Sequence, residues 1–325
     1  MELFSTFVAC YKKLTMDYLI LIGSLALIIV GAMMLTDGSV ALAGRFRVPE
    51  FIVGLTIVAV GTSMPELAVS FFAALEGSAD MAIGNVVGSN IFNVYAALGI
   101  CGLFAPMLFT RSNVRRDIPL CIGVSALLFI VVALGGDINR TEGILLLVSY
   151  IAMLYFTIRA DRKQLMEKSC EVEDAPSMPI WRIVVWIVGG LAGLIFGGQY
   201  CVESASAIAR SLGVSEATIA ITLVAGGTSL PELASSLVSI LRGSPSLALG
   251  NILGSNIANI LLILGVCSTI TPLQLGDVTM TDIAIAVSAP VALLITALII
   301  GRNKLTRIES IAFLAIYAVY VYYLI

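Results

Sequence analysis

The chain has 325 residues, of which 59% are hydrophobic and only 12% are charged, and its mean hydropathy is +1.04. Soluble globular proteins carry about 25% charged residues, so a chain this apolar requires a lipid bilayer as its solvent. The net charge of −3 and the lack of a basic run give no indication of a nucleic-acid partner. The absence of histidine excludes histidine metal sites, histidine proton relays and Ser-His catalysis, and the six cysteines have no CxxC spacing that would indicate zinc.

Ten apolar stretches are long enough to cross a bilayer, which takes about 20 residues. In chain order they lie at 17–44, 48–76, 79–105, 116–135, 141–159, 181–210, 214–242, 245–271, 280–300 and 306–324. The only clearly polar interval separates five spans from five. We therefore predict an all-α integral membrane protein with a first five-helix repeat at 1–160, a cytoplasmic linker at 161–179 and a second repeat at 180–325.

The positions of lysine and arginine predict how the chain is oriented, because these residues accumulate in cytoplasmic loops. Ten spans create two sets of loops, and fourteen of the 18 basic residues fall in the set that includes the linker. The other set holds only Lys12, Lys13, Arg140 and Arg210. We therefore expect a multi-pass protein of the cell inner (plasma) membrane with both termini outside. The N-terminus lacks a basic region and a small-residue cleavage site, so we expect no signal peptide.

One long internal repeat dominates the sequence. Residues 56–106 align without a gap to residues 222–272 at a constant offset of 166, with 26 of 51 positions identical. The identities include GTSxPELA and GNxxGSNIxN, which chance similarity between apolar stretches does not produce. Because each half holds an odd number of spans, the halves enter the membrane from opposite sides. Inverted repeats of this kind are typical of secondary transporters with a binding site at the membrane midplane.

The first motif, GTSMPE at 61–66 and GTSLPE at 227–232, falls in the middle of an apolar span. Proline and glycine there predict a discontinuous helix with freed carbonyls near Ala59 and Ala225. These carbonyls, the hydroxyls and the carboxylates are oxygen donors of the kind that Ca²⁺ and Na⁺ prefer. A carboxylate near mid-bilayer is costly and indicates a functional site, and here it occurs at both equivalent positions. The candidate residues are Glu66, Glu232, Thr62, Ser63, Thr228 and Ser229, with the carbonyls of Ala59 and Ala225.

The second motif, GNVVGSNIFN at 84–93 and GNILGSNIAN at 250–259, lies in the span that follows each glutamate. Ser89 and Asn93 are four residues apart and share a helix face, as do Ser255 and Asn259. We expect these neutral oxygens to face the glutamates, although hydrogen bonding between helices would explain the same residues. The other asparagines of the motif are expected to cap or brace helices.

At these two motifs the chain resembles the sodium/calcium exchangers of the cation/calcium exchanger superfamily. Both signatures occur twice and in order, and the resemblance extends over nearly the whole chain. It implies that Glu66 and Glu232 are central ligands shared by Ca²⁺ and Na⁺, that the other candidate residues complete the sites, and that spans 17–44 and 181–210 slide across a static core. Asn259 departs from several prokaryotic and potassium-dependent members, which have Asp there, so K⁺ cotransport is not expected.

The function predicted from these observations is antiport of Na⁺ against Ca²⁺ by alternating access, without cofactor, catalytic residue or protein partner. A Ca²⁺/H⁺ exchanger of the same superfamily is the nearest alternative, with the glutamates as proton carriers. An ion channel and an intramembrane acid-pair hydrolase are remote alternatives. Two glutamates in identical surroundings do not suit a hydrolase, since an acid and a base need environments that separate their pKa values.

Overall fold

A computed structural model describes residues 2–167, 178–214, 225–276, 278–301 and 303–324, with side chains described outside 2–14, 161–167 and 225. The long helices are α1 (Glu2–Phe46), α7 (Ile118–Gly135), α8 (Arg140–Glu167), α9 (Ile180–Ser211), α15 (Met280–Ile295) and α16 (Arg307–Leu324). Shorter helices are α2 (Glu50–Val53), α3 (Ala59–Thr62), α4 (Met64–Leu75), α5 (Ala79–Ile91), α6 (Gly99–Phe104), α11 (Ala225–Gly227), α12 (Leu230–Leu241), α13 (Pro245–Ala258) and α14 (Gly265–Ile270).

In the described part of the chain, five π-helical segments join these helices into longer rods. They are η1 (Gly54–Val58), η2 (Phe92–Leu98), η3 (Asn113–Asp117), η5 (Asn259–Leu264) and η6 (Thr296–Ile300). Apart from the bent pair at Glu50–Thr62 and Met64–Leu75, eight helices of the described chain are long and apolar enough to cross a membrane, and the pair makes nine. These match the predicted spans except the seventh, 214–242, which lies partly outside the described residues. The count of ten therefore stays a prediction.

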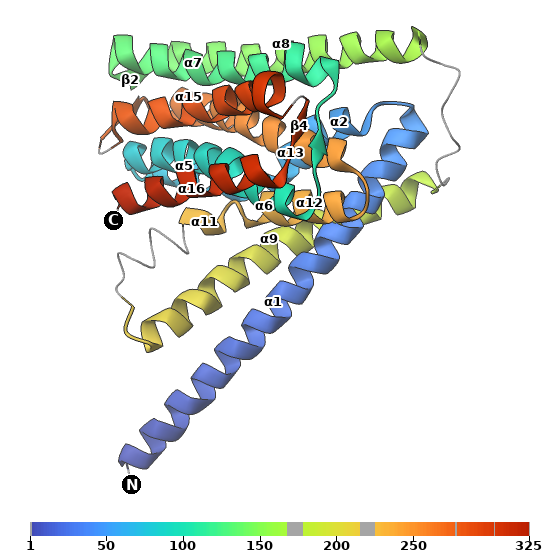
Figure 1. Cartoon of the computed structure of the whole chain (residues 1–325). Coiled ribbons are helices and arrows are strands. Elements are labelled where there is room, and N and C mark those ends of the chain that lie inside the picture. The colour runs from blue at the N-terminus through green and yellow to red at the C-terminus, as the bar shows by residue number, and fades with distance from the viewer. Residues whose placement is uncertain (1, 168–177, 215–224, 277, 302, 325) are drawn as a thin grey trace.

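Two small antiparallel sheets show how the halves are related. β1 (Met107–Leu108) pairs with β4 (Lys304–Leu305), and β2 (Asp137–Ile138) pairs with β3 (Leu273–Gln274). Each sheet takes one strand from each half of the chain. Because α15 and η6 run from β3 to β4, the two sheets lie at opposite ends of the bundle (Figure 1). Equivalent contacts at opposite ends are what an inverted repeat requires.

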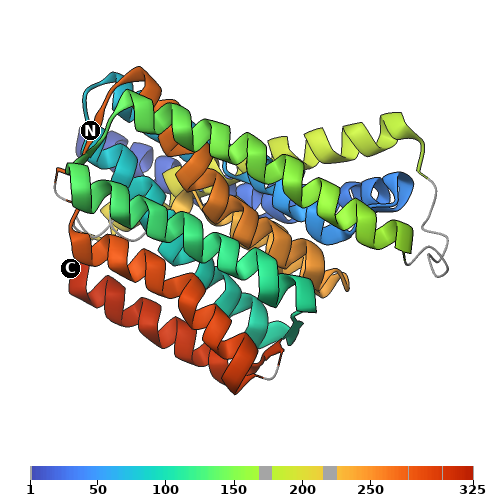
Figure 2. The same cartoon turned by 90° about the horizontal axis from the view of Figure 1, so that it is seen from above.

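Both termini lie at the same end of the helix bundle in two perpendicular views (Figures 1 and 2). The described ends of the segment between the two halves, at the end of α8 and the start of α9, lie at the other end. An even number of spans requires this arrangement. It agrees with the predicted topology, in which each half holds an odd number of spans.

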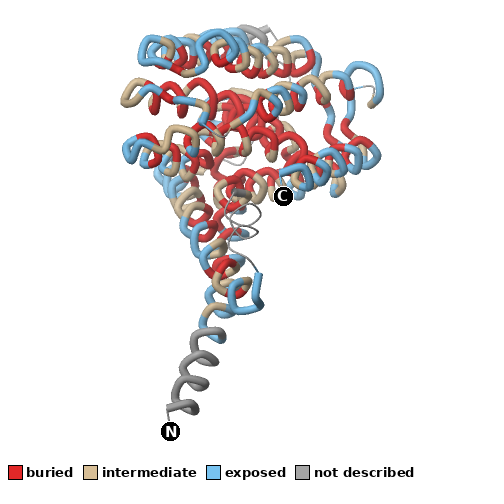
Figure 3. Tube along the Cα trace, turned by 90° about the vertical axis from the view of Figure 1, so that its left-hand side faces the viewer, coloured by how far each residue is buried: buried red, intermediate tan, exposed pale blue. Residues whose placement is uncertain are grey.

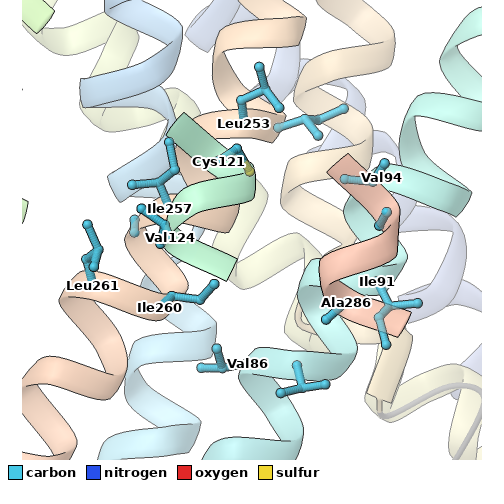
Figure 4. Close-up of a cluster of buried hydrophobic side chains, with 14 of the residues drawn as sticks. Val86, Ile91, Val94, Cys121, Val124, Leu253, Ile257, Ile260, Leu261 and Ala286 are labelled. Carbon is cyan, nitrogen blue, oxygen red and sulfur yellow. The ribbon is translucent and has the colours of Figure 1, made fainter. Parts of the chain in front are cut away.

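The spans that carry the GNxxGSN motif form the centre of the protein. The most apolar stretch is 78% buried in Ala79–Phe104 and 94% buried in Pro245–Ile270, whereas in the other six unbent spans it is 17% to 39% buried. Figure 3 shows the same concentration of buried residues in the interior. Val86, Ile91, Leu253 and Ile257 belong to the large hydrophobic cluster between these spans and their neighbours (Figure 4). Outer helices instead present exposed apolar side chains to the lipid.

Helices α1 and α9 pack against each other and run obliquely past the rest of the bundle (Figure 1). A Cβ on Gly31 would lie 2.9 Å from the carbonyl oxygen of Gly190, so the two backbones touch. Small residues allow this close approach between membrane helices. A separate, smaller hydrophobic cluster, which includes Leu35, Ile187 and Leu194, is centred on this pair. The same cluster also contains Val53, Val58 and Leu247, so it is through these residues that the pair packs against the central spans.

Candidate functional site

The predicted helix break occurs at Ser63 and Ser229. Ser63 has φ −81° and ψ 10°, and Ser229 has φ −89° and ψ 7°, so both lie in the sparsely populated bridge region. The axis bends by 45° between Glu50–Thr62 and Met64–Leu75. Proline stands in the first turn of each following helix, where its missing N–H removes no intrahelical bond. The prediction of a discontinuous helix is confirmed for the first repeat.

Each glutamate lies in the first turn of the helix after the break and is completely buried. Ser229 Oγ donates a hydrogen bond to Glu66 Oε1 over 2.8 Å, and Ser63 Oγ donates to Glu232 Oε1 over 2.9 Å. The serine of one repeat therefore holds the carboxylate of the other. Helix N-termini favour negative charge, so both carboxylates are also stabilised by the helices that carry them. The crossed bonds bring the two motifs into one site.

Asn93 and Asn259 lie where a buried α-helix changes to π-helix, in η2 and at the start of η5. π-Helical turns are frequent at functional sites, because they shift side chains out of regular register. Both side chains are fully buried, and Ser89 and Ser255 one turn earlier are almost so. The sequence predicted the shared face but not the π-helical turn.

Several buried oxygens at this site have no hydrogen-bond partner in the described part of the chain. They are Glu66 Oε2, Glu232 Oε2, Asn93 Oδ1, Asn259 Oδ1, Ser89 Oγ and Thr228 Oγ1. An unpaired buried polar atom costs about 1–3 kcal/mol, so a ligand or water that paired these six would be favoured. A hard cation takes several oxygens at once and would compensate these acceptors. No group of three or more His, Cys, Asp or Glu occurs among the described residues, so neutral oxygens must supplement the two carboxylates.

Other predicted residues have partners already. Thr62 Oγ1 donates to Asn251 Oδ1 over 3.1 Å, and Ser255 Oγ lies 3.4 Å from both Glu232 Oε1 and the Ala59 carbonyl. The expectation that the Ala59 carbonyl is freed is wrong, because it accepts the N–H of Ser63 over 3.0 Å. Proline at position 65 lacks the N–H that would reach residue 61, so the break lies two residues later than expected. Ala225 begins α11, and its side chain lies outside the described set.

The expectation that the remaining motif asparagines brace helices is confirmed for Asn85 and Asn251, but the sequence did not identify the serines that they contact. Asn85 Nδ2 donates to the Glu66 carbonyl and to Ser70 Oγ. Asn251 Nδ2 donates to the Glu232 carbonyl and to Ser235 and Ser236. Both asparagines brace the helix that carries the glutamate. Ser70 and Ser236 are equivalent at the 166-residue offset, and this was the signal that could have identified them.

A cavity of about 770 Å³ lies beside the helix breaks, and of the candidate ligands Thr228 contributes to its lining. Its lining runs from Thr228 and Pro65 at the helix breaks to Glu203 and Arg210 near the end of α9, at the end of the bundle where the termini lie (Figure 1). Away from this cavity, α1 is held to α12 by a 3.0 Å hydrogen bond between the buried hydroxyls of Thr36 and Ser239. An ion pair between Asp37 and Arg242 lies beside this bond.

An inverted-repeat membrane protein with buried, paired carboxylates and unsatisfied oxygens at the repeat interface belongs to the class of cation antiporters. The sequence profile described as sodium/calcium exchanger protein matches residues 16–159 and again residues 182–325. The chain belongs to this family.

Relatives named as an antiporter or as sodium/calcium exchangers match the chain over most of their length. The putative antiporter CaxA of Alkalimonas amylolytica is 37% identical over 311 residues, covering 94% of this chain and 97% of CaxA. The sodium/calcium exchanger MaX1 of Methanosarcina acetivorans is 31% identical over 321 residues, covering 85% of this chain and 90% of MaX1. The solved structure of the sodium-calcium exchanger NCX_Mj, soaked with zero Na⁺ and Ca²⁺, has a TM-score of 0.83 at 28% identity and covers 96% of this chain and 100% of NCX_Mj. These similarities confirm the prediction that the protein is a transporter rather than an enzyme.

Proposed function

We propose that the chain exchanges Na⁺ for Ca²⁺ by alternating access, with net movement of charge and without K⁺. The observation that carries this proposal is the pair Glu66 and Glu232, both fully buried and each with one oxygen lacking a partner among the described residues. Two carboxylates supply a charge of about −2, which balances one Ca²⁺ or two Na⁺. A third Na⁺ on neutral oxygens would make the cycle electrogenic, worth about 2.3 kcal/mol per net charge at 100 mV.

The proposed ligand set is that of the two motifs: Glu66, Glu232, Thr62, Ser63, Thr228, Ser229, Ser89, Asn93, Ser255, Asn259 and the carbonyls of Ala59 and Ala225. Competition of Ca²⁺ and Na⁺ for this set makes exchange rather than cotransport. Asn259 supports independence from K⁺, because no third carboxylate joins the site. MaX1 is itself a sodium/calcium exchanger, which favours Na⁺ as the coupling ion.

The proposed route uses the cavity beside Thr228 on one side of the site. Access from the other side would require the α1–α9 pair to move relative to the core; among the described residues, the large central hydrophobic cluster contains none from α1 or α9, which supports this part of the proposal. We place the arginine-rich end of the bundle in the cytoplasm of a cell with an inner (plasma) membrane, and both termini outside.

The test is ⁴⁵Ca²⁺ uptake into Na⁺-loaded proteoliposomes, with pH clamped on both sides. Uptake should require the outward Na⁺ gradient, be unaffected by K⁺, and respond to membrane potential. Uptake that ignores the Na⁺ gradient would refute Na⁺ coupling. Uptake driven by a pH gradient without Na⁺ would identify the Ca²⁺/H⁺ exchanger instead, with protons carried by the same two carboxylates.

A further inference from the structure

Asn90 and Asn256 form one of the buried polar contacts between the two repeats. Asn90 lies in α5 and Asn256 in α13, with 2% and 1% of their surface exposed. Asn90 Nδ2 donates to the backbone carbonyl of Asn256 over 3.1 Å, and Asn256 Nδ2 donates to that of Asn90 over 3.2 Å. The pair is therefore reciprocal, as a two-fold relation between the repeats requires.

The acceptor oxygens of this pair hold two of the proposed ligands. Asn93 Nδ2 donates to Asn256 Oδ1 over 3.1 Å, and Asn259 Nδ2 donates to Asn90 Oδ1 over 3.0 Å. Asn93 Oδ1 and Asn259 Oδ1 have no partner among the described residues. An asparagine amide is planar, with its nitrogen and oxygen on opposite sides of the carbon. Fixing the nitrogen therefore fixes where the unpaired oxygen points.

We call Asn90 and Asn256 the anchors. Neither of them can rotate its side-chain amide by 180° without losing its hydrogen bonds. If Asn256 flipped, its Oδ1 would face the carbonyl oxygen of Asn90 and its Nδ2 would face the amide nitrogen of Asn93. Both contacts would set like against like in an interior where unpaired polar groups are costly. The backbone carbonyls thus set the direction of the whole chain of amides, which ends at two oxygens available to a cation.

We propose that Asn90 and Asn256 are positioning residues that orient the ligands of the opposite repeat, Asn256 acting on Asn93 and Asn90 acting on Asn259. This inference rests on the proposed function, since it takes Asn93 and Asn259 as cation ligands. An ionised carboxylate at 93 or 259 would set an acceptor against the anchor's Oδ1, so the anchors favour neutral ligands and a site with two formal negative charges.

The test is a set of double-mutant cycles on the Ca²⁺ dissociation constant of the purified full chain, measured by equilibrium binding of ⁴⁵Ca²⁺. Asn256→Ala should weaken Ca²⁺ binding about tenfold, the loss of one well-oriented polar contact. Asn256→Ala should add nothing to Asn93→Ala, whereas its effect should multiply with that of Asn259→Ala. Asn90→Ala should show the opposite pattern, coupled to Asn259 and independent of Asn93.

The crossed pattern separates positioning from general stabilisation, which would weaken binding without regard to partner. Asn113→Ala is the matched control, because this buried asparagine bonds Asp117 away from the site and should leave Ca²⁺ affinity unchanged. Should an alanine variant not fold, Asn256→Ser and Asn90→Ser enter the same cycles. Multiplicative effects within Asn256–Asn93 and within Asn90–Asn259 would overturn the proposal. No effect of Asn93→Ala and Asn259→Ala themselves would instead contradict the proposed ion site.

Discussion

Replacing Glu66 by glutamine should weaken the binding of Ca²⁺ far more than the binding of Na⁺. Glu66→Gln keeps the size of the side chain and an oxygen that can accept the hydrogen bond from Ser229 Oγ, now 2.8 Å from Glu66 Oε1, so the fold should persist. At an effective dielectric constant of about 20, a unit charge pair separated by about 4 Å interacts by about 4 kcal/mol. The lost attraction is therefore about 8 kcal/mol for Ca²⁺ and about 4 kcal/mol for Na⁺.

Only part of this loss should appear in the measured affinity, because the amide also avoids the cost of burying a carboxylate. We expect the Ca²⁺ dissociation constant of Glu66→Gln to rise at least about 100-fold, or about 2.8 kcal/mol, and that of Na⁺ to rise by a smaller factor. Glu232→Gln should behave alike, since the two carboxylates have equivalent surroundings. Equilibrium binding of each ion to purified protein measures both constants.

The matched control is Glu309→Gln. Glu309 is also a buried membrane glutamate, with 9% of its surface exposed, but it caps the start of α16 by accepting the N–H of Thr306 over 2.8 Å. Its replacement should leave both affinities unchanged. The reasoning fails if Glu66→Gln binds Ca²⁺ within threefold of the native protein, or if Na⁺ binding suffers more than Ca²⁺ binding.

Three further changes test the packing and hydrogen bonds around the site. Ser229→Ala leaves Glu66 Oε1 without its hydrogen-bond donor and should lower the stability of the cation-free protein by about 1–3 kcal/mol. The loss should appear as a lower melting temperature that saturating Ca²⁺ largely restores. An unchanged melting temperature would contradict the hydrogen bond between Ser229 and Glu66. Gly250→Ala places a Cβ 2.3 Å from the Phe51 carbonyl oxygen and should destabilise by about 1–3 kcal/mol or prevent folding, whereas Gly123→Ala, with nothing within 4 Å, should be neutral or stabilising in the same thermal assay. Arg242→Gln removes its ion pair with Asp37. Because both side chains are about one-third exposed, the free energy of unfolding should fall by no more than about 1 kcal/mol. A larger loss would contradict the view that this is a weak surface ion pair.

The candidate site was predictable to the extent that it depends on repetition and on the cost of burying charge. Glu66 and Glu232 could be selected because a mid-membrane carboxylate is expensive and each occurs beside the same Gly, Thr, Ser and Pro. That repetition also predicted that Ser63 and Ser229 lie near the carboxylates. It could not predict that each serine bonds the glutamate of the other repeat, because a hydrogen bond between residues 163 or 169 positions apart depends on how the halves dock.

The carbonyl of Ala59 illustrates where local reasoning fails. Proline predicts a break in its helix but not the residue whose backbone departs from helical geometry. Here Ser63 has non-helical dihedral angles, while the Ala59 carbonyl keeps its helical hydrogen bond. The π-helical turns at Asn93 and Asn259 were likewise invisible, because an extra residue in a helical turn leaves the hydrophobic pattern of a fully buried span unchanged.

By itself, the sequence determined that the chain spans a membrane and that its halves are repeats, and it pointed to the two glutamates that the structure buries. These follow from composition and spacing, because unpaired polar groups and charged side chains both carry a large free-energy cost in hydrocarbon. Only the tertiary structure decided the polarity of the site, because the direction of each amide and the partner of each hydroxyl depend on contacts between halves. Asn93 and Asn259 present oxygen rather than nitrogen because Asn256 and Asn90 of the opposite repeat accept their N–H groups.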